Sequence, residues 1–163
     1  MTTKVFEKSV MPVLARHEGD WYGVYVHVDA NGNEVDRHYS HLISVYPQDG
    51  SCNYHQTNRY GWENGQFEEH LFPGNYDAEN NRIIFDTERI WGWAREIDER
   101  HVQLQFTYKD GNDKYVYEFV HLSDDGQNRT RMWHWYNEDG EVYKRTLIKE
   151  SRVKTDAHAK LNL

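Results

Sequence analysis

Hydrophobic and polar residues alternate in short runs from Trp21 onward, and turn residues separate these runs. A period of two residues is typical of strands with one buried face, and turn signals about every ten residues indicate antiparallel hairpins. Asn31-Gly32 and Asn64-Gly65 are two such signals, because Asn-Gly accepts the positive φ angles of a two-residue turn. The pattern predicts about ten strands in simple succession, near residues 21–29, 34–46, 52–62, 66–72, 82–86, 88–97, 101–109, 114–122, 129–137 and 141–149.

The predicted strands follow one another as a meander, and a meander leaves two unpaired edges. Closing the sheet into a barrel removes both edges. A barrel of about eight to ten strands is wide enough inside to hold one small ligand. We therefore expect an all-β, antiparallel up-and-down barrel with an interior of that size.

The two ends of the chain depart from the alternating pattern. Residues 5–17 allow a short helix whose regular part begins near Ser9 or Val10, because Pro12 is best tolerated in a first turn. Residues 151–163 show no strong period and are predicted to form a loosely docked or frayed tail. The chain is expected to be one domain, with an N-terminal helix and cap in 1–18 that closes one end, a barrel in 19–150 and the tail in 151–163.

The composition limits the partners that the chain can have. Of its 163 residues 37% are hydrophobic and 15% aromatic, so amphipathic rings must supply much of the buried area. The net charge of −8 argues against a general surface for nucleic acids or anionic membranes, which need clustered Lys and Arg. No segment reaches the ~20 apolar residues of a membrane span or shows the apolar run of a signal peptide. We expect a soluble, cytoplasmic protein with no nucleic-acid partner and no membrane insertion.

Motifs for common cofactors and nucleophiles are absent from the sequence. Cys52 is the only cysteine, and a lone cysteine is more often a small buried residue than a nucleophile. There is no H-E-x-x-H, G-x-S-x-G, G-x-G-x-x-G or G-K-[ST] segment. A metal site would have to be assembled from separated residues such as His27 and His38. The sequence therefore predicts no cofactor and no metal.

The segment WYGVYVHV, residues 21–28, has two different faces. One face carries Trp21, Gly23, Tyr25 and His27, and the other carries valines. Burial energetics favours the valines inside by roughly 1.5–3 kcal/mol per side chain. If the ring-bearing face points inward instead, the Asn31-Gly32 turn places His38 opposite Tyr25, and the barrel has a polar, aromatic cavity.

The third predicted strand is polar on both faces, so neither face serves an apolar core. Such a strand is solvated or lines a wet cavity, because buried polar groups need partners. A two-residue Asn64-Gly65 turn would place Glu69 opposite Tyr60. The residues expected to line the cavity are Tyr54, Gln56, Asn58, Tyr60 and Glu69. The alternative is a hydrogen-bonded barrel wall without a ligand.

Several segments resemble known families. Glu18-Gly19-Asp20-Trp21 looks like the G-x-W signature that opens lipocalins and fatty-acid-binding proteins, the calycin superfamily. RHEGDWYGVYVHVDANG, YHQTNRYGW, FDTERIWGW, WHWYNEDG and KRTLIKE, between about Arg16 and Glu150, resemble a bacterial lipocalin-like family catalogued as a domain of unknown function. The resemblance implies a calycin barrel with a cavity and no established reaction. It also implies that Trp21 closes the barrel base under a cation from the last strand, Arg145 or Lys144. Together with the polar third strand, it favours the register in which Trp21 points inward.

The ninth predicted strand contains an anchor for a ligand. Arg131 beside Trp133 suits a carboxylate or enolate next to an apolar wall, although the opposite face would present His134. Trp91 or Trp93 would add another ring, with Gly92 allowing close approach. The candidate ligand-binding residues are Tyr25, His27, His38, Tyr54, Gln56, Asn58, Tyr60, Glu69, Trp93, Arg131 and Trp133.

Three functions fit these residues. The first is binding of a small, partly apolar organic ligand in the barrel. The second is cofactor-free acid/base catalysis of the isomerase, cyclase, dehydratase or decarboxylase type, with His27 or His38 as base, Tyr25 or Tyr54 as acid, and Glu69 as a further candidate. The third is a protein-assembly module that docks a partner, including a second copy in a homodimer, on an exposed valine face.

Overall fold

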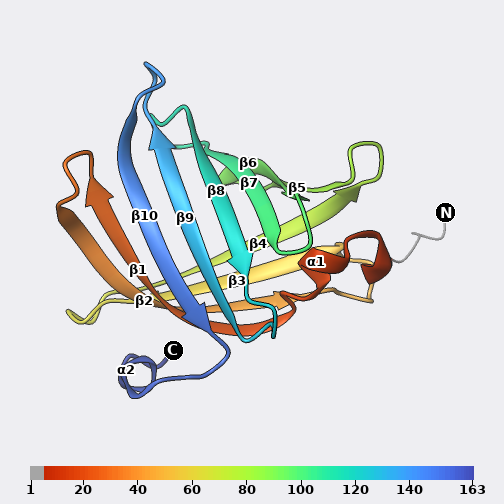
Figure 1. The fold of residues 1–163 in the computed structure, drawn as a ribbon, viewed down its shortest axis with the longest axis horizontal. Coiled ribbons are helices and arrows are strands. Elements are labelled where there is room, and N and C mark those ends of the chain that lie inside the picture. Colours follow the sequence, from red (N-terminus) through yellow and green to blue (C-terminus); the bar gives the residue numbers. More distant parts are fainter. Residues whose placement is uncertain (1–5) are drawn as a thin grey trace.

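The computed structural model describes residues 6–163 and contains a closed barrel of ten antiparallel strands, as the alternating pattern predicted (Figure 1). Each strand pairs with its neighbours in sequence, and β1 pairs with β10 to close the barrel. The elements are η1 (Lys8–Val10), α1 (Pro12–Ala15), β1 (Gly19–Asp29), β2 (Glu34–Val45), β3 (Tyr54–Gly61), β4 (Phe67–Asp77), β5 (Arg82–Asp86), β6 (Ile90–Glu96), β7 (His101–Tyr108), β8 (Tyr115–Leu122), β9 (Asn128–Tyr136), β10 (Val142–Ser151) and α2 (Asp156–Lys160).

The inner face of β1 carries the rings, and the valines lie outside. Trp21 and Tyr25 are almost fully buried, whereas Val24 and Val26 are half-buried on the outer face. Tyr25 pairs with His38 as predicted. The preference for the Trp-inward register over the simple burial of valine is therefore confirmed.

Turn length decides the register of the hairpins. The Asn64-Gly65 turn is a three-residue loop, because Trp62 N–H donates to the Gln66 carbonyl and Gly65 has φ +90°. This loop places Tyr60 opposite Glu68, one residue away from the prediction. The β1–β2 turn has the same length, but a β-bulge between His27 and Val28 restores the predicted pairing.

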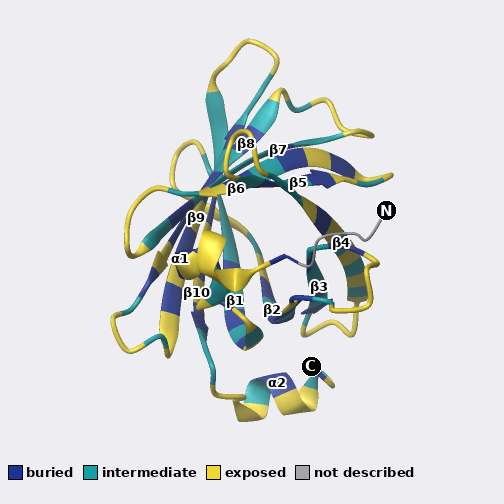
Figure 2. Cartoon of the chain, turned by 90° about the vertical axis from the view of Figure 1, so that its right-hand side faces the viewer, coloured by how far each residue is buried: buried dark blue, intermediate teal, exposed yellow. Residues whose placement is uncertain are grey.

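The N-terminal helix is shorter than expected. η1 and a single helical turn, α1, occupy the predicted helical segment, with Pro12 in the first turn of α1. Val13 and Leu14 are buried, and the Glu96 carboxylate accepts the Leu14 N–H at 2.7 Å. Figures 1 and 2 show α1 at one end of the barrel. The first residues of the predicted cap, 1–5, lie outside the described part of the chain.

The C-terminal segment is docked, so the prediction of a loose or frayed tail is wrong. It forms α2, which lies against the outside of the barrel (Figure 2). His158 is buried, and its Nε2 lies 3.0 Å from the Gly23 carbonyl oxygen. Leu163 is also buried and lies beside Gly61. α2 is a single short turn and is held by only a few buried residues. Its sequence therefore shows no hydrophobic period from which its docking could be predicted. Within residues 6–163, no helix is long and apolar enough to cross a membrane.

Candidate functional site

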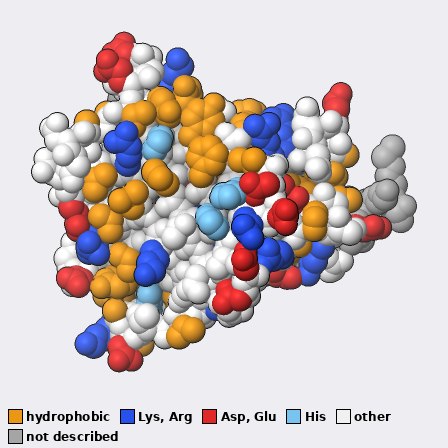
Figure 3. Space-filling view, in the orientation of Figure 1, with side chains coloured by type: hydrophobic (Ala, Val, Ile, Leu, Met, Phe, Trp, Pro, Cys, Tyr) orange, Lys and Arg blue, Asp and Glu red, His pale blue; other side chains and the backbone are white. Residues whose placement is uncertain are grey.

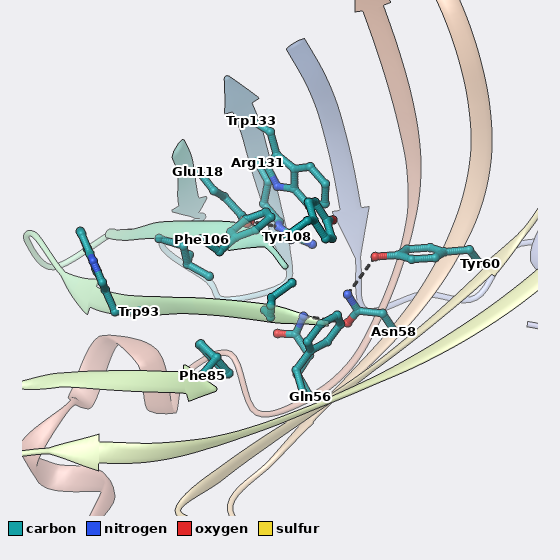
Figure 4. Close-up of a pocket in the computed structure, with 13 residues that line it drawn as sticks. Gln56, Asn58, Tyr60, Phe85, Trp93, Phe106, Tyr108, Glu118, Arg131 and Trp133 are labelled. Atoms are coloured by element: carbon teal, nitrogen blue, oxygen red, sulfur yellow. Dashed lines mark hydrogen bonds and ion pairs between the residues drawn. The ribbon is translucent and has the colours of Figure 1, made fainter. Parts of the chain in front are cut away.

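The barrel interior contains two adjoining cavities. The outer lobe has a volume of about 60 Å³ and is lined by Gln56, Asn58, Tyr60, Phe72, Phe85, Ile90, Trp93, Leu104, Phe106, Tyr108, Glu118, Arg131 and Trp133 (Figure 4). The inner lobe, of about 40 Å³, lies beside α1 and is lined by Leu14, His17, Tyr54, Gln56, Phe85, Ala94, Val102, Leu104, Glu118, Val120, Arg129 and Arg131. One water needs roughly 10–15 Å³. Each lobe therefore has room for a few waters or for part of a small organic molecule.

Four buried charged residues form an ionic cluster where the two lobes meet: Arg129, Arg131, Glu118 and Glu150. Arg131 pairs with Glu118 and lies 3.2 Å from Glu150, which also pairs with Arg129. Burial opposes ionisation of Glu150, but Arg129 and Arg131 outweigh it and lower the pKa of that carboxyl. Two cations and two anions give the cluster no net charge.

Arg131 is consequently not available as the predicted anion anchor. Its guanidinium already pairs with two carboxylates and donates a hydrogen bond to the Tyr25 hydroxyl at 2.9 Å. Binding another anion there would add a third negative charge to a neutral, buried cluster. Arg131 does line the cavity, as predicted, but in a different role.

A ladder of hydrogen bonds runs along the inner face of β3. Gln56 donates to Asn58 at 2.7 Å, and Asn58 donates to the Tyr60 hydroxyl at 2.8 Å (Figure 4). At the other end of the ladder, Tyr54 O–H donates to Gln56. The predicted placement of these four residues inside the barrel is confirmed. Their polar atoms satisfy one another, and Gln56, Asn58 and Tyr60 line the outer lobe while Tyr54 lines the inner one. The strand is therefore a hydrogen-bonded wall that also borders both cavities, and binding of a ligand there stays a prediction.

Trp133 lines the outer lobe and has an unpaired hydrogen-bond donor. It is 6% exposed, and its indole N–H has no partner among the described residues. The ring packs edge-on against Tyr25 and Phe106, with centroids 5.6 and 5.5 Å away. A buried polar group without a partner costs about 1–3 kcal/mol. An acceptor atom on a bound molecule would remove that cost.

His17 is the corresponding feature of the inner lobe. Arg129 donates to its Nδ1 at 3.1 Å, so the proton of the neutral ring is on Nε2, which has no partner in the described structure. Burial, reinforced by the positive charge of Arg129, lowers the pKa of His17 well below its usual value. His17 is therefore neutral at pH 7.

His27 and His38 come together at the barrel end opposite α1, 5.4 Å apart between ring centroids. Burial lowers the pKa of His27 to about 4, and it lowers that of His38 as well. Both are therefore neutral at pH 7. Tyr25 stacks on His38 at 4.8 Å. The predicted trio is assembled, but none of the three residues borders either lobe.

Two predicted positions are wrong. Glu69 lies on the outer face beside Arg59, at 3.5 Å, because the three-residue turn moved the register by one. Arg145 lies opposite His134, far along β10 from Trp21. The cations over the Trp21 indole are Arg152 and Arg129, 3.8 and 4.4 Å from the ring centroid. The expected cation–π contact thus exists, but with other residues, and Lys144 lies over Trp135.

Trp93 lines the outer lobe but lies apart from the other labelled side chains (Figure 4). Sequence reasoning missed Glu118 and Glu150, although a signal was present. Each acid falls on the buried face of its strand, Glu118 between Val116 and Val120, and Glu150 two residues after Ile148. An acidic residue that falls on the same face of a strand as buried apolar residues is itself expected to be buried. A buried acid is rarely found unpaired, so it predicts a basic partner nearby.

Solved structures with the same fold have very low sequence identity to this chain. An S-type phycobiliprotein lyase, CPES from Guillardia theta, has a TM-score of 0.70 and 13% identity over 90% of this chain and 94% of its own. Rv2717c from M. tuberculosis has a TM-score of 0.59 and 8% identity over 89% and 98% of the two chains. At such identities the likeness shows the fold alone. No curated protein matches the sequence.

The sequence itself matches a family profile over most of its length. A protein of unknown function from the DUF3598 family of Nostoc punctiforme has a TM-score of 0.62 and 16% identity, over 86% of this chain. This chain spans about half of that protein, 48% of its length. The expected resemblance to a family of unknown function is confirmed, while the calycin relationship stays a prediction. Because residues 7–155 match the N-terminal domain of unknown function DUF3598, the chain belongs to the DUF3598 family.

Proposed function

We propose that the barrel binds a small, partly apolar organic molecule in the outer lobe. The observation that carries this proposal is a cavity walled by aromatic rings, one of which, Trp133, has a buried N–H without a partner among the described residues. A ligand acceptor atom would receive that N–H, and Phe72, Phe85 and Phe106 would pack against the ligand body. The same barrel fold in a protein named as a phycobiliprotein lyase is consistent with such use.

The charges of the outer lobe narrow the class of ligand. Among the described residues that line it, the charged ones are Arg131 and Glu118, which pair with each other. No unpaired cation therefore faces the cavity to receive a carboxylate. A neutral ring compound with a carbonyl oxygen fits the lobe better than an anion.

Acetophenone, ethylbenzene and benzoate test this preference, because they share a ring and differ in the acceptor or the charge. Acetophenone should bind about 2–10-fold more tightly than ethylbenzene, which corresponds to one hydrogen bond. It should also shift the Trp133 indole N–H resonance, which Trp133→Phe identifies by its disappearance. Benzoate should bind more weakly than acetophenone.

Trp133→Phe should remove the advantage of acetophenone over ethylbenzene, because it keeps a ring and loses the N–H. Trp91→Phe is the matched control, since Trp91 is exposed. Equal binding of the three compounds to the parent protein would contradict the proposal. If acetophenone binds as expected, native mass spectrometry of protein purified from its own host would identify the natural ligand by its mass.

The catalytic alternative has less support. His27 and His38 are neutral and so have the protonation state of a base, but neither borders a lobe. Glu69 is outside the barrel. Binding without turnover therefore fits these positions better than proton transfer.

One observation supports the alternative that the barrel is a protein-assembly module. Val26, Leu147, Met132 and Phe119 lie directly opposite one another across β1, β10, β9 and β8 on the outer face. Figure 3 shows hydrophobic side chains on this side of the molecule, interspersed with Lys, Arg and His. If a second copy covers this row, sedimentation should show a dimer that Leu147→Lys converts to a monomer.

A further inference from the structure

We propose that His27, Asp36 and His38 form a binding site for a divalent transition-metal ion, with Zn²⁺ as the reference ion. One ligand atom from each residue lies within 4.8 Å of the others. His38 Nδ1 is 2.9 Å and His27 Nε2 is 3.9 Å from the same oxygen, Asp36 Oδ2. Ligands about 2.0–2.2 Å from a tetrahedral ion stand roughly 3.3–3.6 Å apart. Small side-chain rotations therefore bring the three atoms to the distances that an ion needs.

Backbone geometry assembles the three residues on one inner face. The β-bulge after His27 pairs that residue with Asp36 and keeps Tyr25 opposite His38. Asp36 and His38 are two residues apart on β2, so both side chains point the same way. The site lies next to the β1–β2 turn, and the Asp36 side chain is 39% exposed, which gives an ion a path from solvent.

Neighbouring hydrogen bonds occupy the atoms that would not bind the ion. His27 Nδ1 lies 2.7 Å from Thr146 Oγ1, which also accepts the Trp135 indole N–H. The Trp62 indole donates to Asp36 Oδ1 at 2.9 Å. His27 Nε2 and Asp36 Oδ2 are thereby directed toward each other. Metal-binding imidazoles and carboxylates are commonly held by such outer contacts.

A simple His38–Asp36 hydrogen bond does not explain the whole cluster. Within residues 6–163, His27 Nε2 makes no hydrogen bond, although it faces a carboxylate oxygen. A metal ion supplies the missing partner for this atom and shares Asp36 Oδ2 with His38.

The charges around the cluster also allow a cation. Asp36 contributes one negative charge, and Glu68 acts on His38 from β4, which is separated from β2 by β3. The nearby cation is Lys144, which lies over the Trp135 ring and whose pKa is lowered by burial. Two imidazoles and one carboxylate leave further coordination positions open, a set that suits Zn²⁺ and Fe²⁺.

The outer surface offers a matched decoy for the test. His101 and His121 are 4.7 Å apart between ring centroids, and Asp98 lies 2.8 Å from His101. Both histidines point away from the lumen. Adventitious binding to surface histidines would use this pair, so His121→Gln is the control variant.

The experiment is a Zn²⁺ titration by calorimetry, followed by gel filtration and metal analysis of the full chain. The parent and H121Q should each retain one zinc ion per chain. His38→Gln and Asp36→Asn should bind Zn²⁺ at least about 100-fold more weakly. Asp36→Asn keeps an acceptor for Trp62, so it tests the site where His38→Gln fails to fold.

Thr146 provides a second, independent readout as a positioning residue. Thr146→Val should weaken Zn²⁺ binding by about 10–100-fold and change the visible absorption spectrum of bound Co²⁺. Zinc binding that is equal in parent, H38Q and D36N, or that is lost in H121Q, would overturn the proposal. So would a parent protein that retains no zinc after gel filtration.

Discussion

The two halves of the barrel interior differ in how they hold their charged groups, although each keeps an unpaired polar atom among the described residues, His17 Nε2 on the α1 side and the Trp133 N–H on the other. In the half covered by α1, Arg129, Glu118 and Glu150 are paired or part of the same neutral cluster. In the other half, Trp133 has an unpaired N–H and lines a cavity, and His27 Nε2 lies 3.9 Å from Asp36 Oδ2, too far for a hydrogen bond. The ionic cluster stabilises the folded barrel. The unpaired atoms of Trp133 and His27 are instead available to a bound molecule or ion. The same contrast separates residues expected to affect stability from those expected to affect affinity.

Glu150→Gln should have the largest effect, because it removes the carboxylate that two buried arginines share. Leaving buried charge without its partner costs about 3–5 kcal/mol. Urea unfolding should show this loss in the free energy of unfolding. Glu69→Gln is the matched control, since its partner Arg59 lies on the surface and an exposed pair is worth about 0–1 kcal/mol. Equal effects of the two changes would refute the proposed division of roles.

Acidification should weaken the α1 half through His17. Its folded-state pKa is lowered by burial and by Arg129, so the unfolded chain binds a proton more readily than the folded one. The stabilisation is complete above the ordinary pKa near 6.5 and is lost as the pH falls below it, by up to about 1.4 kcal/mol per pH unit for one proton.

His17→Gln tests this effect, because Gln accepts from Arg129 and does not titrate. Between pH 6.5 and 5, the free energy of unfolding should depend less steeply on pH in H17Q than in the parent protein. The difference in slope should be up to about 1.4 kcal/mol per pH unit, the value for one proton. Other buried histidines keep part of the slope in both proteins. An unchanged slope would show that the folded protein protonates His17 as readily as the unfolded chain does.

The smallest effects should distinguish two neighbouring tryptophans. Trp135→Phe removes a hydrogen bond from the indole to Thr146 Oγ1, 2.8 Å long, and should cost about 1 kcal/mol. Trp133→Phe removes the same ring volume but an N–H that has no partner, so it should destabilise the fold by about 1 kcal/mol less than Trp135→Phe. Thermal unfolding of the ligand-free proteins measures both. A larger loss in W133F than in W135F would mean that Trp133 N–H is already satisfied.

The strands were predictable because alternation and turn residues are local properties. Glu69 was misplaced because Asn64-Gly65 fits a two-residue and a three-residue loop equally well, and one residue reverses every side chain. The same miscount at Asn31-Gly32 did no harm, because the bulge after His27 cancels it. A bulge depends on contacts between strands, which the local pattern does not contain.

The partners of the buried charges were less predictable. Arg131 could be identified as a lumen residue, but its pairing with Glu118 comes from the neighbouring strand, at a sequence separation of 13 residues. Arg152 was missed as the cation over Trp21, because it follows the last strand in a segment without periodicity. The trio of Tyr25, His27 and His38 was found because one hairpin brings it together.

Gly74 gives the barrel wall a means of diversification. A Cβ atom at this position would lie 2.5 Å from Ile83 Cγ2 and 2.9 Å from Phe85 Cε1, both of them side-chain atoms of the adjacent strand. Phe85 also reaches both lobes. Side-chain volume can therefore move between neighbouring positions, when Gly74→Ala is paired with smaller side chains at both Ile83 and Phe85, without altering a turn or a register. Descendants of one ancestral barrel could acquire chambers of different size through such paired exchanges, while inheriting the same scaffold.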